Sequence, residues 1–158
     1  MKGVTGVVYH EKGNIVTGNY PVFCHQVNCK GVMNAGLARQ IREKYPEVYE
    51  QYEKRCSFGL NLGQIQPVVL YDKRICVNMF AQKGFGRDRV YTDYNAFKEC
   101  LQRLSGLLNS AGMGRFEIIA FPYGIGCGLA GGDWNIISGM IEGFSETVKQ
   151  KVVIVSWK

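Results

Sequence analysis

Two glycine-rich segments, at residues 23–38 and 118–134, carry the residue types of anion-binding turns. Each begins as an apolar strand and continues through a glycine-containing turn into an expected helix. Glycine permits a positive φ and lets backbone N–H groups approach a ligand closely, and a helix N-terminus adds unpaired donors and a positive dipole. Each segment alone is equally compatible with a simple tight turn. Together they predict a ligand with two anionic groups, or one pyrophosphate held from both sides.

The second segment also contains a dinucleotide-binding pattern, Gly126-x-Gly128-x-x-Gly131, directly after its strand. In nicotinamide-binding domains this pattern opens the domain, and an acidic residue follows about 20 positions later at the end of the next strand. Here the sequence ends at Lys158, which leaves no room for the rest of such a unit. We therefore expect no nicotinamide cofactor, and no other cofactor is indicated.

Charge and cysteine usage narrow the function classes further. A formal charge of +6 suits an anionic ligand or a nucleic-acid surface, although there is no continuous basic stripe and most basic residues fit solvated helix faces. The six cysteines lack C-x-x-C spacing, which predicts reduced thiols and a cytoplasmic protein. Cys24, His25 and Cys29 have no second pair of ligands elsewhere, so we expect no metal site.

The first residues become charged too early for a signal peptide. No apolar run approaches the ~20 residues that span a bilayer. We therefore expect no membrane partner.

The elements that must position the two turns alternate between strands and helices, which indicates an α/β layered fold with a largely parallel, covered sheet. Asp133 is expected to cap the last helix, and either Thr92 or Asp93 the one before it. In such folds, strand-to-helix loops gather at the carboxyl edge of the sheet, so both glycine-rich turns are expected there. The predicted strands are 4–9, 22–27, 64–71, 74–80, 117–121 and 152–157, and the predicted helices are 35–45, 46–55, 94–110 and 134–149.

These motifs, taken together and in this order, resemble those of macrodomains, the ADP-ribose-binding modules, over essentially the whole chain. Gly13-Asn14-Ile15 is similar to the turn at the adenine site of that family, although the family usually has Asp where this chain has Asn14. The resemblance implies one domain, residues 1–158, with a three-layer α/β/α fold and a mixed, mostly parallel central sheet. It also implies binding of ADP-ribose or an ADP-ribose derivative.

The resemblance also implies which residues contact the ligand. The segment after residue 27 resembles the loop at the distal ribose and one phosphate, and the segment at 125–129 resembles the loop around the diphosphate. The predicted ligand-binding residues are Asn14, Ile15, Asn28, Val32, Met33, Asn34, Ala35, Gly36, Tyr123, Gly124, Ile125, Gly126, Cys127, Gly128 and Leu129.

The most similar branch contains ADP-ribose-1″-phosphate phosphatases and hydrolases that remove ADP-ribose from glutamate or DNA. Lys83 resembles the catalytic lysine of the hydrolases, which would trap the opened sugar as a Schiff base or stabilise the departing oxyanion. His25 matches the histidine of the phosphatases, as a general acid or a group that positions water. The hydrolases carry an aspartate where this chain has Ala130, so Asp88 or Asp93 is expected to supply the missing carboxylate. Cys127 is expected at a helix N-terminus, which would lower the pKa of its thiol, but no base adjoins it, so we interpret it as a loop residue that contributes its backbone.

Three functions remain open, two from this resemblance and one from the positive charge. The first is a hydrolase acting at the distal ribose, on ADP-ribose-1″-phosphate or on ADP-ribose attached to a protein carboxylate or a nucleic acid. The second is a reader that binds ADP-ribose without turnover, because one expected acid is absent. The third is a basic module that binds nucleic acid.

Overall fold

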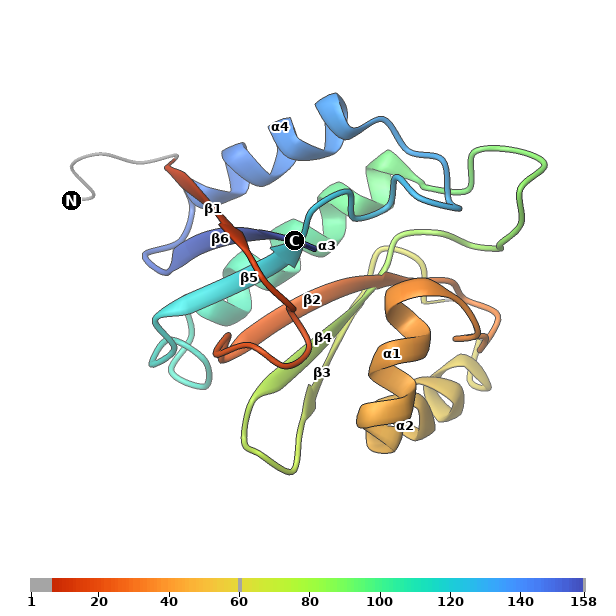
Figure 1. Cartoon of the computed structure of the whole chain (residues 1–158), viewed down its shortest axis with the longest axis horizontal. Helices are drawn as coiled ribbons and strands as arrows, with labels where there is room; N and C mark the ends of the chain where they lie inside the picture. The colour runs from red at the N-terminus through yellow and green to blue at the C-terminus, as the bar shows by residue number, and fades with distance from the viewer. Residues whose placement is uncertain (1–6, 60, 158) are drawn as a thin grey trace.

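The computed structural model describes residues 7–59 and 61–157, in which a six-stranded sheet lies between two pairs of helices (Figure 1). The strand order is β1-β6-β5-β2-β4-β3, and in this sheet only β3 runs antiparallel to its neighbour. The predicted mixed, mostly parallel sheet is therefore confirmed. The strands are β1 (Val8–Lys12), β2 (Val22–Val27), β3 (Ile65–Val69), β4 (Ile75–Phe80), β5 (Ile118–Pro122) and β6 (Lys151–Ser156), and the helices are α1 (Gly36–Lys44), α2 (Pro46–Cys56), α3 (Tyr94–Leu108) and α4 (Trp134–Ser145).

Each face of the sheet packs against its own pair of helices, α1 and α2 on one side and α3 and α4 on the other (Figure 1). Successive side chains of a strand point to opposite faces. In β2, Cys24 therefore joins the core under α3 and α4, whereas Phe23 and Val27 join the core under α1 and α2. This arrangement confirms the predicted three layers. Within the described residues, no helix has both the length and the apolar character needed to cross a membrane.

Most predicted boundaries agree with the structure to within a few residues, and the caps explain why. Asp133 accepts a hydrogen bond from the backbone N–H of Asn135 and caps α4 as predicted. For α3, the prediction left Thr92 and Asp93 open, and the cap is Asp93, which accepts from the backbone N–H of Ala96. The prediction that α4 continues to residue 149 is wrong. The Thr147 hydroxyl donates to the carbonyl of Phe144, and such local bonds compete with a continuing helix. Residues 4–6 of the first predicted strand lie outside the described residues.

One partly buried arginine, Arg74, ties the turn after β1 to the rest of the α1/α2 layer. The Arg74 guanidinium donates to the carbonyls of Gly18 (2.9 Å) and Tyr20 (3.3 Å) and to that of Val16. It also stacks on the Phe23 ring, 4.6 Å from the ring centroid. Because this turn contains Asn14 and Ile15, Arg74 positions two of the predicted ligand-binding residues.

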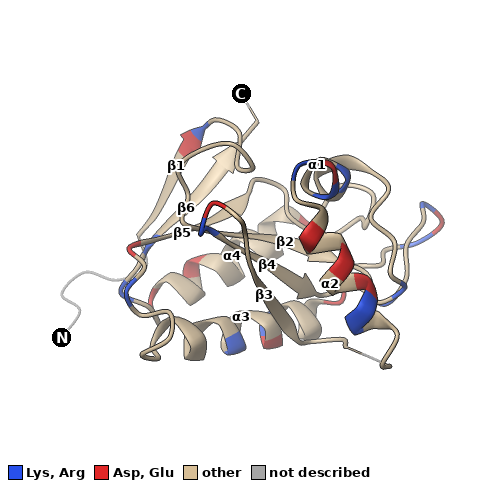
Figure 2. Cartoon of the chain, turned by 90° about the horizontal axis from the view of Figure 1, so that it is seen from below, with Lys and Arg blue, Asp and Glu red and all other residues tan. Residues whose placement is uncertain are grey.

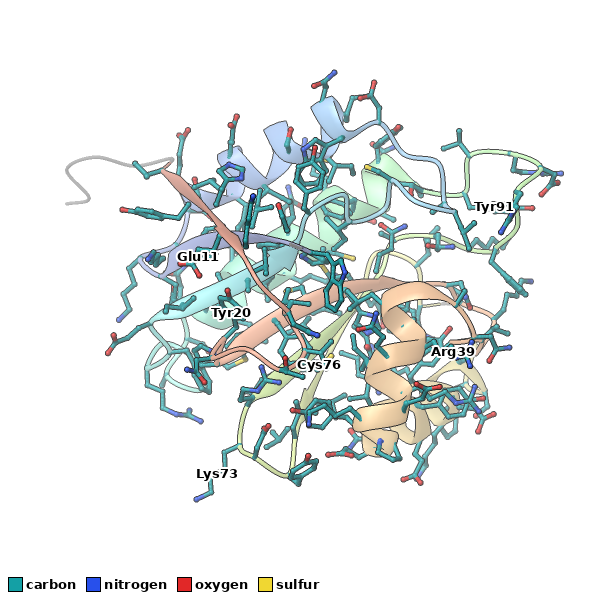
Figure 3. All side chains as sticks on the ribbon, viewed as in Figure 1. Glu11, Tyr20, Arg39, Lys73, Cys76 and Tyr91 are labelled. Atoms are coloured by element: carbon teal, nitrogen blue, oxygen red, sulfur yellow. The ribbon has the colours of Figure 1, made fainter. Side chains whose placement is uncertain are left out.

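Replacing Arg74 with methionine is expected to lower the free energy of unfolding by about 2–4 kcal/mol, because several carbonyls lose their donor inside the protein. Urea denaturation followed by circular dichroism measures this change. The matched control is Arg39→Met on the outer side of α1 (Figure 3), where the ion pair with Glu43 is largely exposed. That control is expected to change stability by less than about 0.5 kcal/mol. Equal effects of the two substitutions would contradict the role of Arg74.

Candidate functional site

A cavity of about 540 Å³ opens where the loops after β2, β4 and β5 meet at one edge of the sheet. Figure 1 shows these three loops gathered at the same end of the molecule. Among the described residues of the cavity wall, Arg87 carries the one formal charge and none is a carboxylate. The cavity is therefore suited to an anionic ligand, because no acidic group opposes a phosphate there.

The wall brings together most of the residues predicted to contact the ligand. The predicted site residues that lie outside the wall are Lys83, Asp88, Asn14, Ile15 and Cys127. The predicted residues in the wall are His25, Asn28, Val32, Met33, Asn34, Ala35, Gly36, Tyr123, Gly124, Ile125, Gly126, Gly128 and Leu129.

The loop after β2 is shaped by Asn28 and a buried tyrosine of α2, Tyr52. The Asn28 side-chain oxygen accepts from the backbone N–H of Lys30 (2.9 Å), and its amide nitrogen donates to the carbonyl of Val32 (2.9 Å). The Tyr52 hydroxyl lies 2.7 Å from the same Asn28 oxygen and accepts from the N–H groups of Gly31 and Val32. Asn28 therefore uses its side chain to shape the loop. The sequence analysis missed Tyr52, whose spacing from Val48 indicates only a buried helix face.

The loop after β5 depends on glycines with left-handed backbone. Gly124 and Gly126 have φ values of 76° and 77°. A Cβ at Gly126 would lie 2.7 Å from Oε1 of Gln26, so only glycine fits there without a shift. Gly128 differs, because a Cβ at this position meets no heavy atom within 4 Å. The space beside Gly128 therefore remains open for a ligand.

The loop after β4 carries the predicted catalytic residues Lys83 and Asp88. Lys83 is exposed, and its carbonyl accepts from the backbone N–H of Cys29 (3.1 Å), so it lies beside the loop after β2. Asp88 is exposed near the loop tip, which Figure 2 shows projecting with basic and acidic residues together. The Tyr91 hydroxyl donates to Asp88 (2.6 Å) and lowers the pKa of this carboxyl, and Arg89 contributes less. The Asp93 carboxylate accepts a hydrogen bond from the backbone N–H of Ala96, where it caps α3.

Comparison with solved structures identifies the architecture. The macrodomain of Mycobacterium tuberculosis DarG superposes with a TM-score of 0.81 over 95% of this chain and 97% of that one, at 23% identity. Thermosipho africanus DarTG in complex with ADP-ribose gives a TM-score of 0.80 over 94% of this chain and 41% of that one, at 18% identity. The fold is that of a macrodomain.

Sequence comparison adds relatives of this chain, although no family model matches it. An uncharacterized 17.5 kDa protein of Enterobacteria phage T4 is 28% identical, over 96% of this chain and 97% of that protein. A DNA ADP-ribosyl glycohydrolase of Mycobacterium tuberculosis is 34% identical over 53 residues, which are 34% of this chain and 15% of the length of that enzyme.

The turn after β1 reaches the same edge of the sheet as the cavity. The backbone N–H of Gly13 donates to the carbonyl of Ser156 (2.9 Å) at the end of β6, which is two strands from β2. The Asn14 side-chain oxygen accepts from the N–H groups of Val16 (2.8 Å) and Thr17 (3.2 Å), and Ile15 is buried. Asn14 therefore uses its side-chain oxygen to stabilise the turn that was predicted to lie at the adenine site.

The end of β2 places two polar side chains in the cavity wall, His25 and Gln26. The Gln26 amide nitrogen donates to Gln82 and to Thr92, each at 2.9 Å. Its oxygen is buried and has no partner among the described residues. Gln26 was missed by the sequence analysis because the contact with Thr92 joins positions far apart in the chain. A buried acceptor of this kind suits a ligand group that donates, such as a hydroxyl.

The environment of Cys127 differs from the predicted one. The helix that follows begins at Trp134, so Cys127 does not lie at a helix N-terminus. Its sulfur lies 3.4 Å from the carbonyl of Ile125, and burial raises the pKa of the thiol, with a smaller contribution from Asp133. The prediction of a lowered thiol pKa is wrong. Among the described residues, no group of three His, Cys, Asp or Glu side chains could hold a metal ion.

Proposed function

We propose that this macrodomain binds ADP-ribose in the cavity and hydrolyses an ADP-ribose derivative at the distal ribose. The observation that carries the proposal is the meeting of both glycine-rich loops in one cavity, whose described wall includes Arg87 and no carboxylate. The fold similarity to DarTG in complex with ADP-ribose supports the ligand, and the segment similar to a DNA ADP-ribosyl glycohydrolase supports the reaction class.

The proposed binding mode places the diphosphate between the loop at 122–130 and the loop at 28–38. Their backbone N–H groups and Arg87 would compensate its charge. The distal ribose would lie beside the end of β2, where Gln26 and His25 line the wall. Lys83 would approach the distal ribose from the rim, because its side chain is exposed and its backbone is bonded to the loop at 28–38.

A reader without turnover is the second candidate, and one observation favours it. The Asp88 carboxylate accepts a hydrogen bond from Tyr91, and the Asp93 carboxylate accepts one from the α3 backbone. Neither aspartate is in the cavity wall. A hydrolase of this architecture would therefore depend on Lys83, His25 or ordered water for its proton transfers.

ADP-ribose is expected to bind with a dissociation constant at least about tenfold lower than that of ADP or NAD, because the cavity is proposed to hold the distal ribose, which ADP lacks and which carries nicotinamide in NAD. Isothermal titration calorimetry measures the three affinities. The same protein is then tested for turnover on ADP-ribose-1″-phosphate, an ADP-ribosylated glutamate peptide and an ADP-ribosylated oligonucleotide. The unmodified oligonucleotide is the control. Binding of this control with equal affinity, and no binding of ADP-ribose, would favour the basic nucleic-acid module.

A further inference from the structure

Three buried polar side chains form a line across the sheet behind the cavity, on the face covered by α1 and α2. We call this line the polar relay; it consists of His25 on β2, Asn78 on β4 and Gln66 on β3. Asn78 pairs in register with His25 on one side and with Gln66 on the other. The three residues are 2%, 0% and 9% exposed. Apolar residues would pack here without any hydrogen-bond requirement, so the polar line needs its own explanation.

The direction of each hydrogen bond in the polar relay is fixed from its far end. The Gln66 amide nitrogen donates to the backbone carbonyl of Gln51 in α2 (3.0 Å), and a carbonyl can only accept. The Gln66 side-chain oxygen must then accept from the Asn78 amide nitrogen (3.1 Å). That leaves the Asn78 oxygen facing Nε2 of His25, at 2.5 Å. His25 Nε2 must therefore carry a hydrogen.

A neutral imidazole with hydrogen on Nε2 has a bare Nδ1 that can only accept. Nδ1 of His25 is buried and has no partner among the described residues. Burial lowers the pKa of His25 to about 4, against the opposing effect of the Asn78 hydrogen bond, so the ring is neutral near pH 7. A buried acceptor without a partner costs about 1–3 kcal/mol. Since His25 lines the cavity wall, a group entering the cavity can remove this cost.

We propose that Asn78 and Gln66 are positioning residues, which hold His25 as the Nε2–H tautomer so that Nδ1 accepts a hydrogen bond from a hydroxyl group or water molecule in the cavity. The identity of this group rests on the proposed function. If ADP-ribose derivatives are the substrates, the donor is a hydroxyl of the distal ribose or the attacking water. His25 then acts as an acceptor that orients this group. It is not a general acid in this state, because its single N–H proton is bonded to Asn78.

The tautomer is tested directly by long-range ¹H–¹⁵N correlation spectroscopy of the uniformly labelled protein. The chain has two histidines, and His10 on the exposed β1 serves as the internal reference. A His25→Asn variant assigns the signals. We expect a bare Nδ1 and a protonated Nε2 in His25 from pH 8 to about pH 5.5. Hydrogen on Nδ1, an equal mixture of tautomers, or titration of His25 at its ordinary pKa would overturn the proposal.

The relay itself is tested with Gln66→Leu and Asn78→Asp. In Gln66→Leu, the Asn78 amide loses the acceptor that orients it, so a mixture of His25 tautomers and about fivefold weaker ADP-ribose binding are expected. In Asn78→Asp, a carboxylate still accepts from Nε2, so the tautomer is retained and the pKa of His25 rises. A structural role alone would not produce this pair of outcomes. Unchanged His25 signals in both variants would overturn the relay.

Two controls separate the possible failures. Gln150→Leu removes another buried amide, whose nitrogen donates to the carbonyl of Leu108, and it is expected to leave the His25 signals unchanged. Amide correlation spectra confirm that each variant is folded. Addition of ADP-ribose to the wild-type protein is expected to shift the Nδ1 signal without protonating it. A wild-type protein that has the expected tautomer but does not bind ADP-ribose contradicts the proposed function and leaves the tautomer assignment intact. Binding without a change at Nδ1 overturns its role as the acceptor.

Discussion

Binding of ADP-ribose is expected to weaken by about 100-fold or more when Gly128 is replaced by glutamate. Gly128 lies in the cavity wall, and a Cβ there meets no heavy atom within 4 Å, so the fold can accept a side chain. The new carboxylate would occupy space where the diphosphate is proposed to bind. Like charges brought together in a binding site cost several kcal/mol, which exceeds the effect of steric crowding alone. Isothermal titration calorimetry measures the loss.

The matched control for this substitution is Gly139→Glu in α4, which adds the same charge at an exposed glycine with equally open space. It is expected to keep the wild-type affinity, and thermal unfolding shows whether both variants are folded. A Gly126 variant would be less informative, because a left-handed φ and the nearby Gln26 oxygen make any side chain there destabilising. Wild-type affinity in folded Gly128→Glu would exclude this cavity as the phosphate site.

Removal of the Lys83 amine is expected to lower kcat on carboxylate-linked or DNA-linked ADP-ribose by about 100-fold or more, while ADP-ribose affinity stays within about twofold. A group that acts only in the transition state contributes to turnover and little to ground-state binding. Lys83 fits this role because it lies at the rim of the cavity and outside the wall. Single-turnover rates and calorimetry on Lys83→Ala measure the two quantities separately.

Lys98→Ala, at an exposed lysine of α3, is the control for lost positive charge and is expected to behave as wild type. If the substrate is instead ADP-ribose-1″-phosphate, His25→Ala is expected to cause the larger loss and Lys83→Ala the smaller one. Because His25 is buried, its variant needs a check of folding. A wild-type protein that binds ADP-ribose and turns over none of these substrates would leave the reader as the function.

Most of the fold was predictable from the sequence because local patterns determine it. The apolar run at residues 22–27 predicts β2 with the observed bounds, and side-chain type and position predicted the Asp133 cap and narrowed the α3 cap to Thr92 or Asp93. The two glycine-rich turns were expected at one edge of the sheet, and they meet there in one cavity. Parallel strands share their carboxyl edge whatever their order, so this conclusion needed no knowledge of the strand order.

The contacts that orient the site were not predictable in the same way. The bond from Gln26 to Thr92 and the alignment of His25 with Asn78 depend on which strands pair and in which register. A single sequence does not determine that register locally. Asn28 is a different case, because its residue type suggests a ligand contact, whereas its side-chain amide is bonded within its own loop.

The polar relay also has a consequence for how the sheet assembles. A shift of β2 against β4 by two residues keeps the same faces buried, so apolar packing alone discriminates poorly against it. Such a shift would place His25 opposite Cys76 or Phe80 and leave Asn78 opposite Phe23 or Val27. Each buried amide or imidazole would then lack its partner, at about 1–3 kcal/mol apiece. The residues that orient His25 in the finished protein therefore also favour the native alignment of β2 and β4 during folding.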